Sequence, residues 1–156
     1  MDVKIENLKP VHVAYVRNLG PYTTCGVTWD KLWQWMKEKK MSCGGRLIIG
    51  ASWDDPENTP HEKIRYDCCV EVDRNFKPDK RINVMEIKGG EYAVYRHVGS
   101  YGEIAPAFQR LFREWFPQSG RKSSGDPCLE IYRSDHDKTP PDKLITDLCV
   151  PLAPKE

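Results

Sequence analysis

The chain has 156 residues, which is enough for one well-packed core and short for two. Its 24 basic and 23 acidic side chains nearly cancel, leaving a formal charge of +1, and neither sign is gathered into a tract. This balance argues against a dedicated nucleic-acid binder, whose affinity comes mainly from neutralising phosphates. No apolar run approaches the length of a membrane span, and no signal-peptide pattern begins the chain, so we expect a cytoplasmic protein that does not bind membranes.

The six cysteines form no CxxC pair, and no histidine lies at ligand spacing from any of them. We therefore expect no zinc site, and the sequence points to no other metal or cofactor. In a reducing compartment these cysteines act as small apolar residues.

The first half of the chain predicts four strands around one helix. The helix is expected to follow a turn at residues 20–22, to be capped by Thr23 or Thr24, and to end before Gly44-Gly45. Its apolar face is formed by Trp29, Leu32, Trp33 and Met36. The strands are expected at residues 3–8, 11–19, 47–49 and 64–72.

The same order of elements returns after a polar connector at residues 73–80. Gly89-Gly90 is a strong hairpin signal and predicts that the strands on either side of it pair with each other. A second helix carries Phe108, Leu111, Phe112 and Trp115, and Pro117 is expected to end it. The strands of this half are expected at residues 82–87, 92–98, 127–132 and 144–152.

A numerical offset confirms that the two halves repeat. Gly99 and Gly20 are separated by 99 − 20 = 79 residues, and the same offset carries the apolar residues of the first helix onto those of the second. The sequence therefore predicts an α+β fold of two duplicated strand-helix-strand-strand modules, at about residues 1–73 and 81–153. We expect them to form one domain over residues 1–156, with pseudo-twofold symmetry, an antiparallel sheet and two main helices flanking a ligand cleft.

Glu130 breaks this repeat. It lies in an alternating strand with Cys128 and Tyr132 on its own side, and an offset of 130 − 48 = 82 places it opposite Ile48. A carboxylate among apolar groups needs a partner, a proton or a ligand of opposite charge. The alternative is that Glu130 faces water on an edge strand.

Aromatic residues on both helices complete the predicted site. Rings around one carboxylate suit a flat, lipophilic cation, although helical stripes of this kind usually pack a core. His97, which takes the place of Asn18 in the repeat, is expected at the surface rather than as a base. The expected ligand-binding residues are Glu130, Tyr132, Tyr101, Trp29, Trp33, Phe108, Phe112 and Trp115.

Several stretches resemble the GyrI-like small-molecule-binding family, also called the AraC-type effector-binding domain. The most specific of these stretches is DDPENTPHEKIRYD, from Asp54 to Asp67. It is similar to the family's loop followed by a strand with an acidic residue. Further similar stretches are residues 86–94, the turn at 99–101 and PCLEIY at 127–132. Together they extend over nearly the whole chain.

The resemblance implies a ligand cleft between two modules, with Glu130 similar to the acidic residue that meets cationic drugs. It also implies three possible roles. We expect a multidrug-binding protein that sequesters lipophilic, aromatic and often cationic compounds. One alternative is a hydrolase of cyclopropane-bearing genotoxins, in which Glu130 is the general base and Tyr132 donates a hydrogen bond to the developing oxyanion. The other alternative is an inhibitor whose partner is DNA gyrase.

Overall fold

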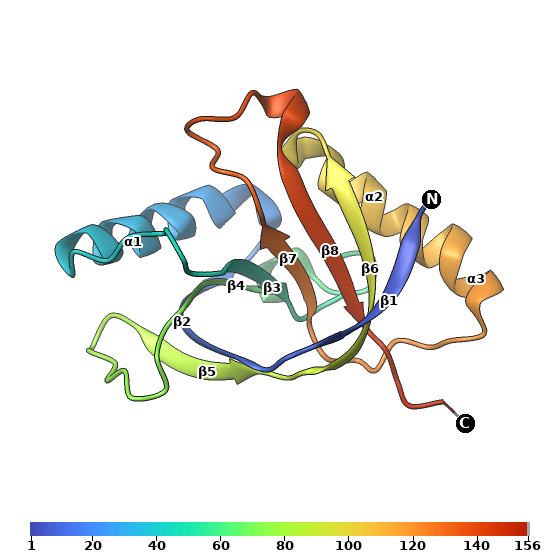
Figure 1. Ribbon diagram of the computed structural model, residues 1–156, viewed down its shortest axis with the longest axis horizontal. Coiled ribbons are helices and arrows are strands. Elements are labelled where there is room, and N and C mark those ends of the chain that lie inside the picture. Colours follow the sequence, from blue (N-terminus) through green and yellow to red (C-terminus); the bar gives the residue numbers. More distant parts are fainter. Residues whose placement is uncertain (156) are drawn as a thin grey trace. The chain divides into compact units, whose positions relative to one another are not determined.

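The computed structural model describes residues 1–155, and the chain forms two compact units (Figure 1). One unit contains residues 10–88, and the other contains residues 1–9 together with the chain from residue 89 onward. Each unit has antiparallel strands and one main helical segment. The predicted α+β class, with antiparallel strands and two main helices, is therefore confirmed.

The unit of residues 10–88 is a sheet in the order β3-β4-β2-β5 with one long helix. The helix, α1, covers Cys25–Glu38 and buries Thr28, Leu32, Trp35 and Met36. Short 3-10 turns, η1 and η2, cover Tyr22–Thr24 and His61–Lys63. The strands are β2 at Val11–Leu19, β3 at Ile48–Ser52, β4 at Arg65–Glu71 and β5 at Asn83–Ile87.

The other unit is a sheet in the order β1-β6-β8-β7, and its helical segment packs on β8. The strands are β1 at Val3–Leu8, β6 at Gly90–Val98, β7 at Cys128–Tyr132 and β8 at Ile145–Pro151. The helical pieces are η3 at Tyr101–Glu103, α2 at Ile104–Arg110, a π-helix η4 at Leu111–Trp115, α3 at Phe116–Ser119 and η5 at Pro141–Lys143. Its core joins Ile104, Ala107 and Leu111 to Leu148 and Val150.

The predicted hairpin at Gly89-Gly90 is wrong. β5 pairs with β2, whereas β6 pairs with β1 on one side and β8 on the other. Gly90 does adopt φ 132°, a value that favours glycine. It lies where the chain passes from β5 to β6, two strands that pair with different neighbours. A local turn signal was outweighed by pairing between strands distant in sequence.

The prediction of Thr23 or Thr24 as the cap of α1 is right in position for Thr24, but neither threonine caps the helix with a side-chain hydrogen bond. Thr24 stands at the N-cap, but its hydroxyl is directed to Oδ1 of Asn18 at 3.1 Å and to the carbonyl of Pro21. Thr28 in the first turn donates to the same Asn18 oxygen at 2.8 Å. Asn18 of β2 therefore fastens the start of the helix to the sheet.

The second helical segment does not end at Pro117, which lies inside α3. Proline cannot donate a backbone hydrogen bond, and its ring crowds the carbonyl four residues earlier. The π-helix η4 directly precedes it, and the Phe116 amide bonds to the Leu111 carbonyl five residues back. This wider turn lets the segment continue to Ser119, where Gly120 at φ 71° ends it.

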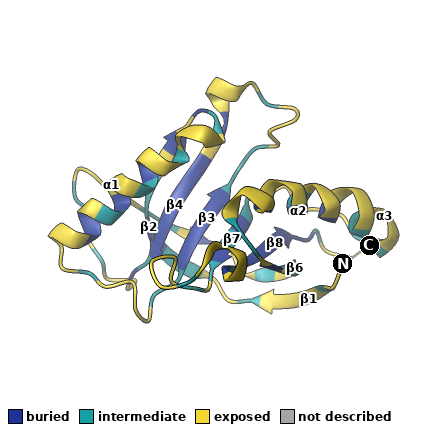
Figure 2. Cartoon of the chain, turned by 90° about the horizontal axis from the view of Figure 1, so that it is seen from above, coloured by how far each residue is buried: buried dark blue, intermediate teal, exposed yellow. Residues whose placement is uncertain are grey.

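The strands differ in how far their residues are buried (Figure 2). β3 and β4 are almost wholly buried, whereas β1 is exposed along most of its length. Over residues 1–155, no helix combines the length and the apolar character needed to cross a membrane.

The end of α1 yields a first prediction. Lys40, at φ 57°, takes the left-handed position of a Schellman motif, with the Met41 amide bonded to the Met36 carbonyl at 2.9 Å. Lys40→Gly should therefore raise the free energy of unfolding by about 0.5–1 kcal/mol in urea titrations, because glycine adopts this conformation without strain.

Lys37→Gly, in the last turn of the same helix, is the matched control and should lower that free energy by about the same amount. If both glycines destabilise the protein, the left-handed position carries no strain and the account of this helix end fails.

Candidate functional site

Strand register changes the repeat partner of Glu130. Glu130 lies opposite Leu148 of β8, and Gly50 lies opposite Cys68 of β4. Because β8 and β4 are related by 148 − 68 = 80 residues, Glu130 is equivalent to Gly50, and the match to Ile48 was wrong. The offset of 82 places Glu130 opposite an apolar residue of the other half, whereas the hydrogen-bonded ladders make Gly50 its structural equivalent.

Gly50 is needed where it stands because a tyrosine occupies the space above it. A Cβ on Gly50 would lie 2.0 Å from Oη of Tyr66 on the neighbouring strand, far inside van der Waals contact. The residue equivalent to Tyr66, 80 positions later, is Thr146, which is much smaller. One unit thus has glycine under tyrosine, and the other has Glu130 beside threonine.

Glu130 is half-buried, between the apolar surroundings and the water-facing position that the sequence left open, and is held by a short hydrogen bond. Tyr132 donates from Oη to Oε1 of Glu130 at 2.6 Å, the length of a charge-assisted bond. The Tyr101 ring meets the Tyr132 ring edge-on, with centroids 5.4 Å apart. We call Glu130, Tyr132 and Tyr101 the Glu130 cluster.

Two further carboxylates lie near this cluster. Burial raises the pKa of the Tyr101 phenol, and the charges of Asp135 and Asp137 raise it further. Ligand atoms of Asp135, His136 and Asp137 lie within 4.8 Å of one another, but all three residues are exposed, so we assign no metal to them. The carboxylates of Asp135 and Asp137 add negative potential beside Tyr101.

Arg96 and Arg133 belong to the sheet that contains Glu130, but they bind a carboxylate on the opposite face of that sheet. Asp147 accepts two hydrogen bonds from Arg96, at 2.9 and 3.1 Å, and one from Arg133 at 2.8 Å. Burial opposes the charge of Asp147, but these bonds outweigh it and lower the pKa of the carboxyl. Asp147 lies opposite Ile131, and neighbouring residues of a strand point to opposite faces, so this network is on the side away from Glu130.

The remaining aromatics of the second helical segment form a separate group. The rings of Phe112 and Phe116 stack at 5.2 Å, and Trp115 meets Phe116 edge-on at 5.0 Å. Phe112 is 43% exposed, whereas Phe108 and Trp115 are partly buried against the core. Phe116 directly follows Trp115 and was not among the predicted ligand-binding residues.

Trp29 and Trp33 belong to the unit of residues 10–88 and stack on each other, with centroids 5.3 Å apart. Both are half-buried. Trp29 also meets Tyr66 edge-on at 6.4 Å, and Tyr22 contacts Tyr66 at 5.8 Å. Neither Tyr66, in an expected strand, nor Tyr22, in the expected turn at residues 20–22, was among the predicted ligand-binding residues.

His97 is buried, so its predicted surface position is wrong. It is 7% exposed, and its Nε2 lies 3.0 Å from the carbonyl oxygen of Ser100. Asn18, its partner in the repeat, is also buried. Both residues fasten the start of a helical segment, and neither is positioned as a catalytic base.

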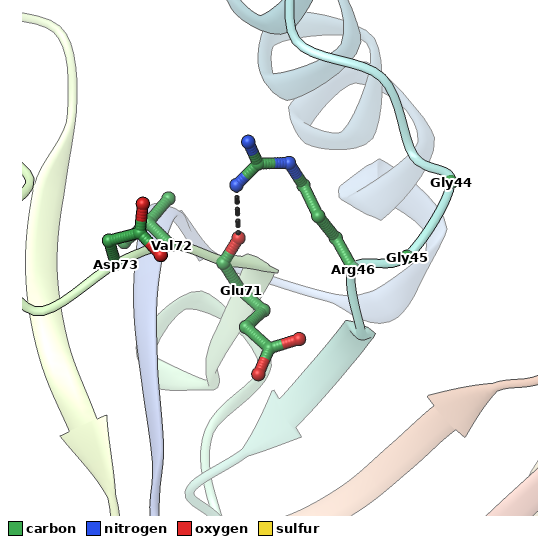
Figure 3. A pocket seen from close by; sticks show the side chains of 6 residues that line it. All are labelled: Gly44, Gly45, Arg46, Glu71, Val72 and Asp73. Atoms are coloured by element: carbon green, nitrogen blue, oxygen red, sulfur yellow. Dashed lines mark hydrogen bonds between the residues drawn. The ribbon is translucent and has the colours of Figure 1, made fainter.

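A surface hollow in the unit of residues 10–88 does not contain the Glu130 cluster (Figure 3). Arg46 donates to the Glu71 carbonyl at 3.0 Å, and the Glu71 carboxylate accepts from the Leu47 amide at 3.0 Å. These polar groups fix the chain that leads into β3 and do not suit a lipophilic ligand. The hollow is lined by Gly44, Gly45, Arg46, Glu71, Val72 and Asp73.

A family model for the GyrI-like small molecule binding domain matches residues 1–153. The chain belongs to the GyrI-like family. It is 33% identical over 156 residues to the probable transcriptional regulator YgiV of Escherichia coli K12, which covers 98% of this chain and 97% of that protein. It is also 29% identical over 140 residues to a DNA gyrase inhibitor of Yersinia enterocolitica, covering 86% of this chain and 88% of that protein.

Solved structures share the GyrI-like fold at low sequence identity. The C-terminal domain of EcmrR superposes with a TM-score of 0.78 at 16% identity, covering 99% of this chain and 98% of that one. A protein bound to tetraphenylphosphonium superposes with a TM-score of 0.68 at 14% identity, covering 98% and 94% of the two chains. These likenesses establish the fold.

The glycine under Tyr66 gives a second prediction. Gly50→Ala should lower the free energy of unfolding by about 1–3 kcal/mol, because the new methyl group meets the Tyr66 ring. In a Tyr66→Leu background, which removes the clashing end of the ring, the cost should fall by about 0.5 kcal/mol or more.

Gly26→Ala serves as the control, since a Cβ there meets nothing within 4 Å and alanine favours the helix. An unchanged cost of Gly50→Ala in the Tyr66→Leu background would show that the two positions do not compete for one space.

Proposed function

We propose that this protein binds lipophilic, aromatic cations through Glu130 and thereby sequesters them. The observation that carries the proposal is a half-buried carboxylate, held by Tyr132, whose ring meets that of Tyr101, at a position where the other unit has glycine. Membership of the GyrI-like small-molecule-binding family supports the binding role. A protein of the same fold bound to tetraphenylphosphonium supports the class of ligand.

The energetics of the cluster favour a cation. A carboxylate that is partly removed from water loses hydration, and an incoming cation offsets that loss. Tyr101 and Tyr132 offer ring faces, and each cation–π contact adds about 0.5–2 kcal/mol. Asp135 and Asp137, close enough to affect Tyr101, add attraction for positive charge.

The other aromatic residues remain proposed ligand contacts. Phe112 is the most exposed of them, at 43%, and the stacked pair of Trp29 and Trp33 is half-buried. A ligand that reaches the tryptophans should quench their emission. The residues concerned are Trp29, Trp33, Phe108, Phe112 and Trp115.

Replacing the carboxylate by an amide tests the charge directly. Glu130→Gln keeps the size of the side chain and an oxygen that can accept from Tyr132, but removes the negative charge. Calorimetry should show tetraphenylphosphonium binding weakened about tenfold or more, while neutral triphenylphosphine oxide changes by about twofold or less.

Glu114→Gln is the matched control, because its side chain is 61% exposed and it changes the net charge of the protein equally. It should leave both affinities nearly unchanged. Equal losses for the cation and the neutral compound in Glu130→Gln would refute the electrostatic role.

Hydrolysis of cyclopropane-bearing compounds is a second candidate, because the Glu130 cluster joins a carboxylate that can act as a base to the Tyr132 phenol, which can act as a hydrogen-bond donor. In such a reaction Glu130 takes a proton from water, the oxygen attacks a ring carbon, and the pair of electrons from the broken bond moves into the conjugated carbonyl. Tyr132 would turn from Glu130 to donate a hydrogen bond to the resulting oxyanion, which then takes the proton held by Glu130 and restores the carboxylate. Mass spectrometry of the hydrated product tests this candidate. An enzyme should form the product faster than buffer alone, and the Glu130→Gln variant should form it no faster than buffer.

The DNA gyrase inhibitor of Yersinia enterocolitica, 29% identical to this chain, motivates a separate assay. An inhibitor would reduce gyrase supercoiling in proportion to its concentration. A pure small-molecule binder would leave supercoiling unchanged.

A further inference from the structure

β1 is the outermost strand of its sheet and exposes a long backbone edge (Figure 2). The four residues between Val3 and Leu8 are all exposed, and Ile5 is 45% exposed. Within residues 1–155, β6 is the one strand that pairs with β1. Natural sheets protect such edges or use them for pairing, because unpaired amides and carbonyls accept another strand.

The hydrogen-bond pattern fixes which groups of β1 point outward. The Gly99 amide bonds to the Leu144 carbonyl, and the Leu152 amide to the Glu91 carbonyl, so odd-numbered residues of β6 face β8. Even-numbered residues of β6 therefore face β1.

These even-numbered residues lie opposite Lys4, Glu6 and Leu8, whose amides and carbonyls are accordingly turned toward β6. The outward groups belong to Val3, Ile5 and Asn7.

Those outward groups match a second copy of themselves. If two β1 strands lie antiparallel with Ile5 opposite Ile5, then Val3 meets Asn7 on both sides, and the pairs formed by these outward-facing residues are hydrogen-bonded pairs. Lys4 of each copy then lies opposite Glu6 of the other, at the closer, non-hydrogen-bonded positions. The pairing provides two ion pairs and one apolar contact at its centre.

Neighbouring registers lack this complementarity. A shift that centres the pairing on Lys4 sets the two Lys4 side chains against each other and brings Glu6 opposite Asp2. A shift that centres it on Glu6 sets the two glutamates against each other. The charges of Lys4 and Glu6 thus disfavour the two neighbouring registers and favour the one centred on Ile5.

We infer that β1 is a self-association surface, through which two copies of the protein join their sheets edge to edge in the register centred on Ile5. A strand of six residues buries little area, so the dimer is weak and forms at high concentration. The surface does not involve Glu130 and is independent of the proposed ligand binding.

Sedimentation velocity over about 10 µM to about 1 mM tests the inference. Wild-type protein should shift from monomer to dimer across this range. Lys4→Glu and Glu6→Lys should each weaken the dimer about tenfold or more, because both ion pairs become like-charge contacts. The double variant Lys4→Glu/Glu6→Lys restores complementarity and should dimerise again, and an equimolar mixture of the two single variants should form heterodimers.

Hydrogen exchange gives a residue-level readout that does not depend on substitutions. The amides of Val3, Ile5 and Asn7 should gain protection as concentration rises, while those of Lys4 and Glu6 should not change. Circular dichroism confirms that each variant is folded. A wild type that stays monomeric up to about 1 mM, or a dimer that the charge exchange does not restore, would overturn the inference.

Discussion

One volume beside the central strands, on the helix-facing side of each sheet, can hold one large polar side chain. In the unit of residues 10–88 the Tyr66 ring fills it and requires Gly50 beneath, with 2.0 Å separating a hypothetical Cβ from the phenol oxygen. In the other unit Thr146 takes the place of the ring, and Glu130 takes the place of the glycine. Steric exclusion between neighbouring strands therefore decides which half of a duplicated fold carries the charge.

The repeat preserves structural groups while it alters this position. Asp67 and Asp147 each accept two hydrogen bonds from an arginine of the next strand, Arg17 and Arg96 respectively. These pairs lie on the face away from the helix and are similar in both units, as expected for groups that stabilise the sheet. Glu130 has no counterpart, so its presence calls for an explanation other than folding, and ligand binding supplies one.

The sequence predicted the class of fold, the duplication and most strands, because alternation and helical spacing are local and repeat at a fixed offset. It failed where non-local pairing decided the outcome. Gly89-Gly90 looked like a hairpin although β6 pairs with β1, and Pro117 looked like a helix end although a π-helix accommodates it. Glu130 was singled out correctly as an asymmetric residue, but its true partner, Gly50, could be found only from strand register.

A crystal structure of the protein with tetraphenylphosphonium tests the central claim most directly. The account predicts that the cation lies against the Glu130 carboxylate with its phenyl groups on Tyr101 and Tyr132, on the helix-facing side of β7. Density for the ligand elsewhere, for example in the polar hollow at Arg46, with the Glu130 cluster unchanged, would contradict it.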